Sequence, residues 1–240
     1  MSLSAGVHAS ASSTGTSSLA TASRTTQTTG SGLYVGFAIS DGVQTFSSLV
    51  DSFSNTWVQI GTEQVSATFT RQRTYYCANA NGGAGHTVTL TTTGSGPCSM
   101  WFLEVATTNG AGLVLDQQAQ NTDTVSPFTS PSITTTVADE LLVSMHMENS
   151  SNGLLNHAES TGFTVSVGDD VTDGDTLWAG QSATRVVSSI ATYNSSWTVS
   201  GGGTSSGPRI WIASFSETAV LILSAQQQGI NNPMIGRRYV

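Results

Sequence analysis

The chain has 240 residues, only 9% of them are charged, and its formal net charge is −8. None of the seven basic residues is a lysine, which argues against a surface that follows a nucleic-acid backbone, because such surfaces need clustered lysine and arginine. Residues 1–15 lack the basic start and apolar stretch of a secretory signal, and the apolar run at 219–223 is too short to cross a bilayer. The composition predicts a protein made in the cytosol. Its low charge suits either packing against other subunits or a threonine-rich sheet without a partner.

Two stretches of the chain resemble each other. Residues 95–105 (SGPCSMWFLEV) match residues 206–216 (SGPRIWIASFS), with an offset of 111 between the prolines and 110 between the tryptophans. Further back, residues 33–39 (LYVGFAI) match residues 141–147 (LLVSMHM) with an offset of 108. Self-similarity at a roughly constant offset indicates repeated structural units. The sequence therefore predicts an internal duplication, about 20–117 and 131–224.

Alternating apolar side chains in both copies predict β-strands, and no stretch favours a helix. We expect an all-β protein of two antiparallel sheets, a jelly-roll-like sandwich to which both copies contribute. Two tandem sandwiches of about 100 residues each are the alternative. The expected organisation is an N-terminal arm at 1–19, the sandwich at 20–217, and a terminal strand with a docking arm at 218–240. Residues 117–131 show no periodicity and are interpreted as the crossover between copies.

The few cysteines and histidines do not form a ligand pattern in the sequence. Cys77 and Cys98 are too few for a disulfide scaffold, and two reduced, half-buried thiols are favoured over a disulfide. None of the four histidines lies at zinc-ligand spacing from these cysteines. His146 lies on the less apolar side of its strand, where a sheet-face histidine with satisfied hydrogen bonds is expected rather than a ligand.

The best candidate for a metal site in the sequence is an acidic turn. Residues 167–176 (VGDDVTDGDT) bring together Asp169, Asp170, Asp173 and Asp175. Several carboxylate and carbonyl oxygens from one short loop suit a hard cation such as calcium. The stretch lacks the bidentate glutamate of a helix-flanked calcium loop, so an exposed acidic turn without an ion is the alternative. No other cofactor is expected.

Catalysis is weakly supported, and we expect a protein that is not an enzyme. There is no G-x-S-x-G elbow, and Glu104 has Ser214 or Phe215 as its counterpart in the second copy, so no carboxylate pair for glycoside hydrolysis is implied. Glu104 is expected on the solvent face of its strand. A sugar-binding surface would need exposed aromatic side chains, for which Trp57, Tyr34 and Tyr76 are candidates.

The order of the predicted strands and their residue composition resemble those of a known class of proteins. A threonine-rich strand precedes GLYVGFAIS (residues 32–40), followed by DSFSNTWVQIG (51–61), YYCANA (75–80), GHTVTLT (85–91) and WFLEV (101–105). Across about residues 20–217 this resembles β-sandwich proteins encoded in the structural gene clusters of tailed bacteriophages, although no short diagnostic motif supports it. Similar jelly-roll modules occur in bacterial surface and secreted proteins.

The resemblance implies a virion component made in the host cytoplasm, such as a capsid decoration protein, a head fibre, or a tail or baseplate accessory. Its partners would be capsid or tail subunits and further copies of itself, with no nucleic acid and no membrane. The competing class is a carbohydrate-binding module or host-surface adhesin. The chain departs from adhesive modules at its end, where Met234, Arg237, Arg238, Tyr239 and Val240 form an arm suited to docking on an acidic neighbour. A frayed terminus is the alternative interpretation of that arm.

Overall fold

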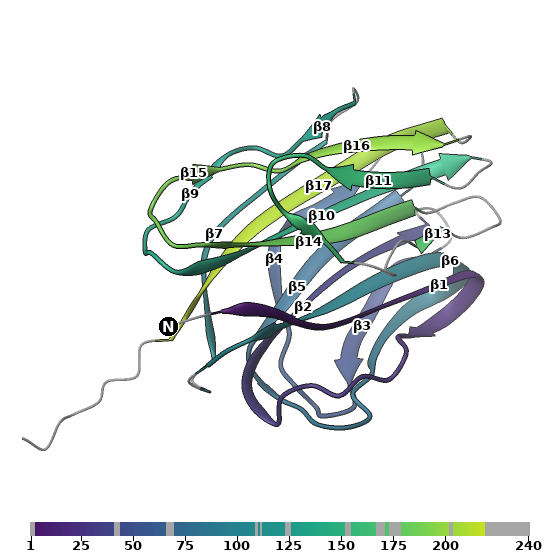
Figure 1. The fold of residues 1–240 in the computed structure, drawn as a ribbon. Coiled ribbons are helices and arrows are strands. Elements are labelled where there is room, and N and C mark those ends of the chain that lie inside the picture. Colours follow the sequence, from purple (N-terminus) through teal and green to yellow (C-terminus); the bar gives the residue numbers. More distant parts are fainter. Residues whose placement is uncertain are drawn as a thin grey trace, which may run out of the picture.

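The computed structural model describes residues 3–40, 44–65, 70–108, 110, 112–122, 126–151, 155–166, 171–172, 179–201 and 204–218. These residues form antiparallel β-strands and contain no helix, which confirms the predicted all-β class. We call residues 3–108 the first half and residues 112–218 the second half. Figure 1 shows the sheet of the first half, in purple to blue, beneath that of the second half, in green to yellow.

The first half forms one six-stranded sheet with the order β1-β6-β2-β5-β4. Its strands are β1 (Ser4–Ala20), β2 (Thr29–Ser40), β3 (Phe46–Asp51), β4 (Val58–Val65), β5 (Thr70–Asn81) and β6 (Val88–Ala106). The long strand β6 has two sets of partners, because its last residues pair with β2 whereas its first residues pair with β3. Strand β1 follows β6 through both parts and forms an edge of the sheet.

The second half forms a larger sheet with the order β12-β14-β10-β17-β7, and two smaller sheets. The larger sheet contains β7 (Leu113–Thr122), β10 (Glu140–Ser151), β12 (Thr164–Val165), β13 (Val171–Thr172), β14 (Ala179–Val187) and β17 (Thr204–Glu217). The smaller sheets contain β8 (Phe128–Thr129), β11 (Leu155–Glu159) and β16 (Ser196–Gly201), and β9 (Ile133–Thr134) with β15 (Thr192–Tyr193). We call the sheet β11-β16-β8 the outer layer of the second half.

A central core joins the two halves, because its buried apolar side chains come from the large sheets of both. Its largest members include Tyr34, Trp101, Met145, Trp211 and Phe215. The two sheets approach so closely that a Cβ on Gly36 would collide with the Met145 sulfur atom. The two sheets therefore pack face to face, as in a sandwich.

Each half also has an outer core on the opposite face of its large sheet. The outer core of the first half contains Ala9, Leu19, Leu33, Val35, Phe37, Ile39, Leu49, Tyr75, Cys77, Ala80, Val88, Leu90, Cys98, Met100 and Phe102. The outer core of the second half contains Phe128, Ile133, Leu142, Phe163, Ala183, Val187, Trp197, Ile210 and Ile212. Strands β2, β6, β10 and β17 are therefore buried on both faces, although β10 and β17 also carry polar residues such as His146 and Ser214 on the outer face.

Polar contacts also connect the halves. The Arg209 guanidinium in the second half donates from Nη2 to the Val65 carbonyl at 3.0 Å. The Gln120 side chain donates from Nε2 to the Thr62 hydroxyl at 2.7 Å, and the Thr108 amide donates to the Glu217 carboxylate at 2.5 Å. These contacts place β4 of the first half beside β7 and β17 of the second.

The strands of the two halves correspond in order and pairing. The series β6-β2-β5 of the first half matches β17-β10-β14 of the second, and β3 beside β6 matches β11 beside β16. Gly36 pairs with Trp101, and Met145 pairs with Trp211. Aligning the two tryptophans, which both face the central core, therefore aligns Gly36 with Met145 at an offset of 109. The offset of 108 expected for this strand is wrong by one residue, and such a shift exchanges the two faces of a strand.

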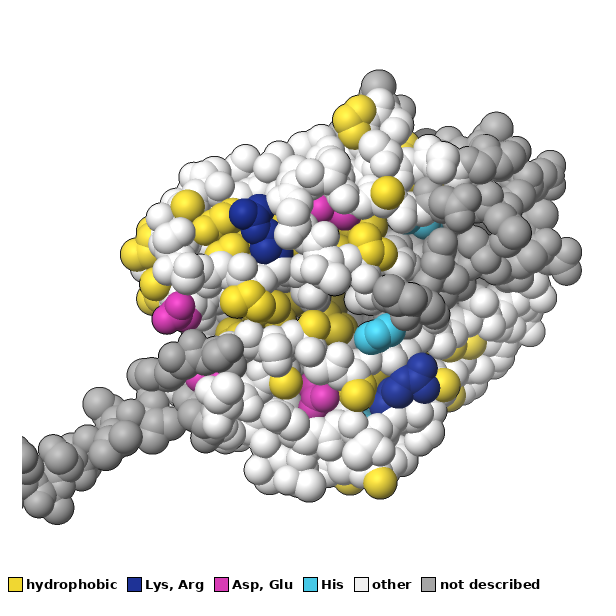
Figure 2. Space-filling model, viewed as in Figure 1, with side chains coloured by type: hydrophobic (Ala, Val, Ile, Leu, Met, Phe, Trp, Pro, Cys, Tyr) yellow, Lys and Arg dark blue, Asp and Glu magenta, His cyan; other side chains and the backbone are white. Residues whose placement is uncertain are grey.

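Two segments differ from their expected roles. Residues 117–122 lie in β7 and pair with β17, so the first part of the expected crossover is an edge strand. Most residues of this segment are polar, which suits an edge strand whose side chains are only partly buried. The expected N-terminal arm lies on the first sheet as β1, which has 17 residues and contains neither a charged residue nor a proline. On the face shown in Figure 2, charged side chains are few and scattered.

Candidate functional site

Three buried side chains in the second half bring together the atom types that bind metal ions. His146 and Glu148 alternate along β10, so both point to the same face of the sheet, toward the outer layer. His157 comes from β11, a strand of that layer. The potential ligand atoms of the three side chains all lie within 4.8 Å of one another. We call these three residues the His–Glu–His cluster.

Within this cluster, Glu148 and His157 already interact. The Glu148 Oε1 and His157 Nε2 atoms are 3.0 Å apart, and neither side chain is exposed to solvent. Burial of a carboxylate is costly unless a partner compensates the charge. The imidazole of His157 provides part of that compensation.

His146 is held in place by aromatic rings and not by hydrogen bonds. Its ring stacks on Phe128 with centroids 5.2 Å apart and planes at 11°, and on Trp197 at 6.0 Å and 22°. The Trp197 Nε1 atom donates to the Ser144 hydroxyl at 2.9 Å, which fixes the indole. Neither ring nitrogen of His146 has a hydrogen-bond partner among the described residues, although the side chain is buried. The expectation of a satisfied sheet-face histidine is therefore wrong.

The electrostatic surroundings keep His146 neutral. Burial lowers the pKa of His146 well below its usual range, and the neighbouring His157 lowers that pKa further. A neutral imidazole has a free lone pair on one nitrogen, which is the form that binds metals. Two imidazoles and one carboxylate are a recognised ligand set for divalent transition metals.

The first half places apolar residues at the three equivalent positions. The alignment of Gly36 with Met145 puts Phe37 at the position of His146 and Ile39 at that of Glu148. Leu49 of β3 pairs with Leu90 in β6, and His157 of β11 pairs with Val199 in β16. Because β3 beside β6 matches β11 beside β16, Leu49 occupies the position of His157. Phe37, Ile39 and Leu49 all belong to the outer core of the first half. In the first half, apolar side chains alone therefore fill the space that the His–Glu–His cluster occupies in the second half.

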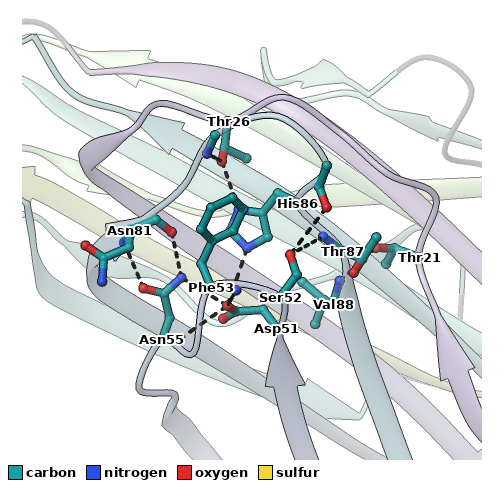
Figure 3. A network of polar contacts seen from close by, with 12 residues as sticks. Thr21, Thr26, Asp51, Ser52, Phe53, Asn55, Asn81, His86, Thr87 and Val88 are labelled. Atoms are coloured by element: carbon teal, nitrogen blue, oxygen red, sulfur yellow. Dashed lines mark hydrogen bonds and ion pairs between the residues drawn. The ribbon is translucent and has the colours of Figure 1, made fainter.

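The first half buries a histidine elsewhere, in the polar network of Figure 3. His86 Nδ1 lies 2.8 Å from the Thr26 hydroxyl, and His86 Nε2 lies 3.7 Å from Asp51 Oδ1. The His86 ring packs on Phe53, with centroids 4.9 Å apart. Burial lowers the pKa of His86, whereas Asp51 and Glu104 act to raise it. A hydroxyl, an imidazole and a carboxylate are the groups of a nucleophilic triad, but here all three are buried.

The role of Asp51 is to cap a turn. Its Oδ1 atom accepts hydrogen bonds from the backbone amides of Phe53, at 2.8 Å, and Asn55, at 3.3 Å. Glu159, at the equivalent position of the second half, accepts from the amides of Thr161, at 2.8 Å, and Phe163, at 3.1 Å. Both carboxylates thus bond the amides two and four residues further on. The recurrence of this arrangement identifies the Asp51 network as structural.

The metal and docking residues expected from the sequence lie outside the described residues. This holds for Asp169, Asp170, Asp173 and Asp175, which follow β12 or flank β13, and for Met234, Arg237, Arg238, Tyr239 and Val240. The calcium site and the docking arm therefore stay predictions.

Glu104 does not lie on a solvent face. It is buried, and its Oε1 atom accepts a hydrogen bond from the Gln27 amide at 2.7 Å, while Oε2 accepts from Val7 at 3.4 Å. The carboxylate therefore holds β1 and the segment after it against β6. The expectation of an exposed Glu104 is wrong, because β1 and the segment after it lie beside the strand that carries it and supply the amides that its carboxylate binds.

The aromatic residues considered for sugar binding are not freely exposed. Tyr34 is fully buried, and burial raises the pKa of its hydroxyl. Trp57 and Tyr76 are partly buried against the outer core of the first half and the central core, respectively. An open hollow of about 330 Å³ is lined by Ser54, Asn55, Thr56, Val58, Cys77, Ala78, Asn79 and Asn81. The Asn55 amide in this hollow is already bonded to the Asn81 backbone, at 2.8 Å in each direction.

Both cysteines are free thiols, as favoured from the sequence, and both are buried more completely than expected. Burial raises the pKa of the Cys98 thiol to about 11 and also raises that of Cys77. Such thiols are poor nucleophiles and poor metal ligands at neutral pH.

Comparisons with known proteins found no matching family model, no matching curated protein and no matching solved structure. Among the described residues there is no helix with the length and apolar character needed to span a membrane.

Sequence reasoning missed the His–Glu–His cluster, although a signal was present. His146 and Glu148 are separated by one residue on a strand, so they share a face, and His157 follows nine residues later. Finding the cluster required knowing that β11 lies over β10. The short sequence of β11 (LNHAE) gives only a weak strand signal, and its pairing with β16 spans about 40 residues.

Proposed function

We propose that the protein is a non-enzymatic structural subunit that binds neighbouring subunits through sheet edges and terminal segments. The observation that carries this proposal is strand β1. It is a 17-residue edge strand without a charged residue or proline, and its outer edge pairs with no strand among the described residues. Monomeric proteins usually protect long edges with lysine, proline or short strands. An edge of this length and composition is suited to accepting a strand from a neighbour.

The proposed neighbours are further copies of this chain and other subunits of a particle. The resemblance to tailed-bacteriophage β-sandwich proteins supports a virion component, such as a capsid decoration, head-fibre or tail accessory protein. The low charge of the chain supports the same proposal, because surfaces buried between subunits are depleted in charged residues. The docking arm at Arg237 and Arg238 would add a second contact, and a calcium ion at Asp169 to Asp175 would stabilise a loop.

The correspondence of the halves supports the proposal that both derive from one duplicated unit. Strand order, pairing and the turn caps at Asp51 and Glu159 recur. In this interpretation each unit is a small sandwich with its own outer core, and the two units pack back to back through the central core. A single jelly-roll-like sandwich to which both copies contribute, as predicted from the sequence, is the other arrangement that such a duplication allows.

The test of the edge proposal adds positive charge to β1. In the double variant Ser12→Lys/Thr14→Lys, both substituted side chains are exposed. We expect the wild-type chain to form a defined oligomer in light scattering and the variant to be monomeric and folded. The matched control is Thr198→Lys/Ser200→Lys, which adds the same charge at exposed positions of β16, an interior strand of its sheet. A wild-type monomer at all concentrations, or dissociation by both variants alike, contradicts assembly through β1.

The docking arm is tested separately by deleting residues 231–240. The proposal predicts a folded, soluble chain that no longer joins its assembly, whereas normal incorporation of the truncated chain contradicts a docking role. The alternative function, a carbohydrate-binding module, predicts glycan binding that depends on an exposed aromatic. The burial of Tyr34 and the partial burial of Trp57 favour the assembly proposal over it.

A further inference from the structure

We propose that His146, Glu148 and His157 bind one divalent transition-metal ion of the zinc class, which ties the outer layer of the second half to its large sheet. This inference concerns the interior of the second half and does not depend on the proposed assembly function. It is argued from the geometry of the cluster, from the unpartnered imidazole, and from the equivalent residues of the first half.

The geometry requires only a small adjustment to accept an ion. Donor atoms about 2.1 Å from a tetrahedral zinc ion lie roughly 3.4 Å from one another. In the structure, Glu148 Oε1 and His157 Nε2 are 3.0 Å apart, and all ligand atoms of the cluster lie within 4.8 Å of one another. The atoms farthest apart therefore need to approach by at most about 1.4 Å to reach this spacing.

The unpartnered imidazole is the second argument. A buried polar group without a hydrogen bond costs about 1–3 kcal/mol, and neither nitrogen of His146 has a hydrogen-bond partner among the described residues. A metal ion would satisfy one of these nitrogens and also neutralise the buried Glu148 carboxylate. Gln181, directly opposite His146 on β14, has a buried amide oxygen that likewise lacks a hydrogen-bond partner among the described residues. Two neighbouring buried side chains, His146 and Gln181, therefore carry polar atoms that no contact among the described residues satisfies.

The first half carries apolar residues at the positions equivalent to the His–Glu–His cluster. The fold closes the equivalent place with Phe37, Ile39 and Leu49, so a polar cluster is not required for packing. In the second half all three mutually adjacent positions carry metal-binding side chains instead. A single polar replacement would leave a buried group to compensate, whereas the three together supply three ligands to one ion.

The ligand types indicate the class of ion. Two imidazole nitrogens and one carboxylate oxygen suit zinc, cobalt, nickel or ferrous iron, whereas calcium and magnesium prefer oxygen ligands alone. Three protein ligands leave a fourth position for a water molecule or another group. Because the ligands come from β10 and β11, the bound ion would strengthen the link between two layers that already share the contact of Glu148 with His157 and the hydrogen bond from Trp197 to Ser144.

The experiment uses the tag-free full-length chain, freed of metal by a chelator and then titrated with zinc or cobalt. We expect one ion per chain by elemental analysis, a visible absorption band with cobalt, and no displacement of zinc by excess calcium. Zinc should also raise the midpoint of thermal unfolding, because an ion that binds only the folded state stabilises it.

The decisive variant replaces the cluster with the residues of the first half, His146→Phe/Glu148→Ile/His157→Leu. We expect it to fold without metal and to lose zinc affinity by about a hundred-fold or more. The matched control His8→Gln removes a histidine outside the cluster and should keep stoichiometric binding. The absence of stoichiometric binding in the wild type, or equal binding in the triple variant, would overturn the proposal. A triple variant that does not fold is replaced by His146→Phe alone, which leaves the contact between Glu148 and His157 in place and to which the same two outcomes apply.

Discussion

The two halves of the chain have the same strand order but treat buried polar groups differently. In the first half, His86 lies at the end of the outer core, where the Thr26 hydroxyl bonds its ring, and the outer core itself is apolar. In the second half, His146 packs on Phe128 and Trp197 of the outer layer, and neither of its ring nitrogens has a hydrogen-bond partner in the part of the chain that the structure describes. The comparison separates what the fold requires from what one half has added. The fold requires the turn-capping carboxylates and the apolar cores, and the His–Glu–His cluster is additional.

The largest expected effect tests the central core shared by the halves. Trp101→Ala and Trp211→Ala each remove a buried indole from equivalent positions, so each should lower the free energy of unfolding by about 4 kcal/mol. Denaturant unfolding of the two variants measures this loss. A large loss for one variant and almost none for the other would show that the two positions are not equivalent.

The next prediction compares the removal of one residue of the His–Glu–His cluster with the replacement of all three. In metal-free protein, His157→Leu removes the imidazole that lies 3.0 Å from the buried Glu148 carboxylate, and should cost about 3 kcal/mol. The triple exchange to the residues of the first half removes the carboxylate as well, and should cost less than about 1.5 kcal/mol because it is a hydrophobic replacement in a packed layer. Chemical denaturation in the presence of a chelator compares them. Equal losses of unfolding free energy would contradict the claim that phenylalanine, isoleucine and leucine can replace the cluster in the second half.

A pH effect is expected from Glu140 in the second half. Burial, together with the neighbouring Asp116 carboxyl, raises the pKa of Glu140 from its ordinary value of 4.5 to about 7. Because the folded state then holds the proton more tightly than the unfolded state, the stabilisation is complete below pH 4.5 and is lost as the pH rises through 7. The loss is at most about 3 kcal/mol, at 1.36 kcal/mol for each pH unit of difference.

Glu140→Gln removes this titration, so the stability of the variant relative to the wild type should increase between pH 4.5 and pH 8. The equivalent position in the first half is Ser31, which does not titrate. Unfolding curves across this pH range measure the difference. A constant difference between variant and wild type would mean that Glu140 does not titrate in this range.

The smallest effect concerns the turn caps. Asp51→Asn and Glu159→Gln each weaken two charge-assisted hydrogen bonds to backbone amides, and each should cost about 1–2 kcal/mol. The two costs should be similar because the arrangements are equivalent. A negligible cost at Asp51 alone would indicate that its carboxylate is not a cap.

Much of the fold could be predicted from alternation and self-similarity, because strands such as residues 33–39 and 141–147 show period two clearly. The alignment of these strands was wrong by one residue for a physical reason. Both strands are buried on both faces, so the apolar pattern does not say which face meets the other sheet. Only the pairing of Gly36 with Trp101 and of Met145 with Trp211 decides it.

The candidate site could be predicted only in part. The spacing of His146 and Glu148 places both on one face of a strand, but His157 reaches them through the outer layer, which depends on pairings between distant segments. Glu104 was misplaced for a similar reason, because the strand that lies beside its own, β1, is rich in serine and threonine and has the composition of a flexible arm. Long-range contacts of polar strands leave little trace in local sequence.

The most direct test of the difference between the halves is hydrogen exchange of the full-length chain with and without zinc. Slower exchange is expected in the second half, at Glu140–Ser151 and Leu155–Glu159, where the ion would join β10 to β11. The equivalent strands of the first half, Thr29–Ser40 and Phe46–Asp51, should exchange at unchanged rates. No zinc-dependent change at β10 and β11, or an equal change in both halves, would contradict the account.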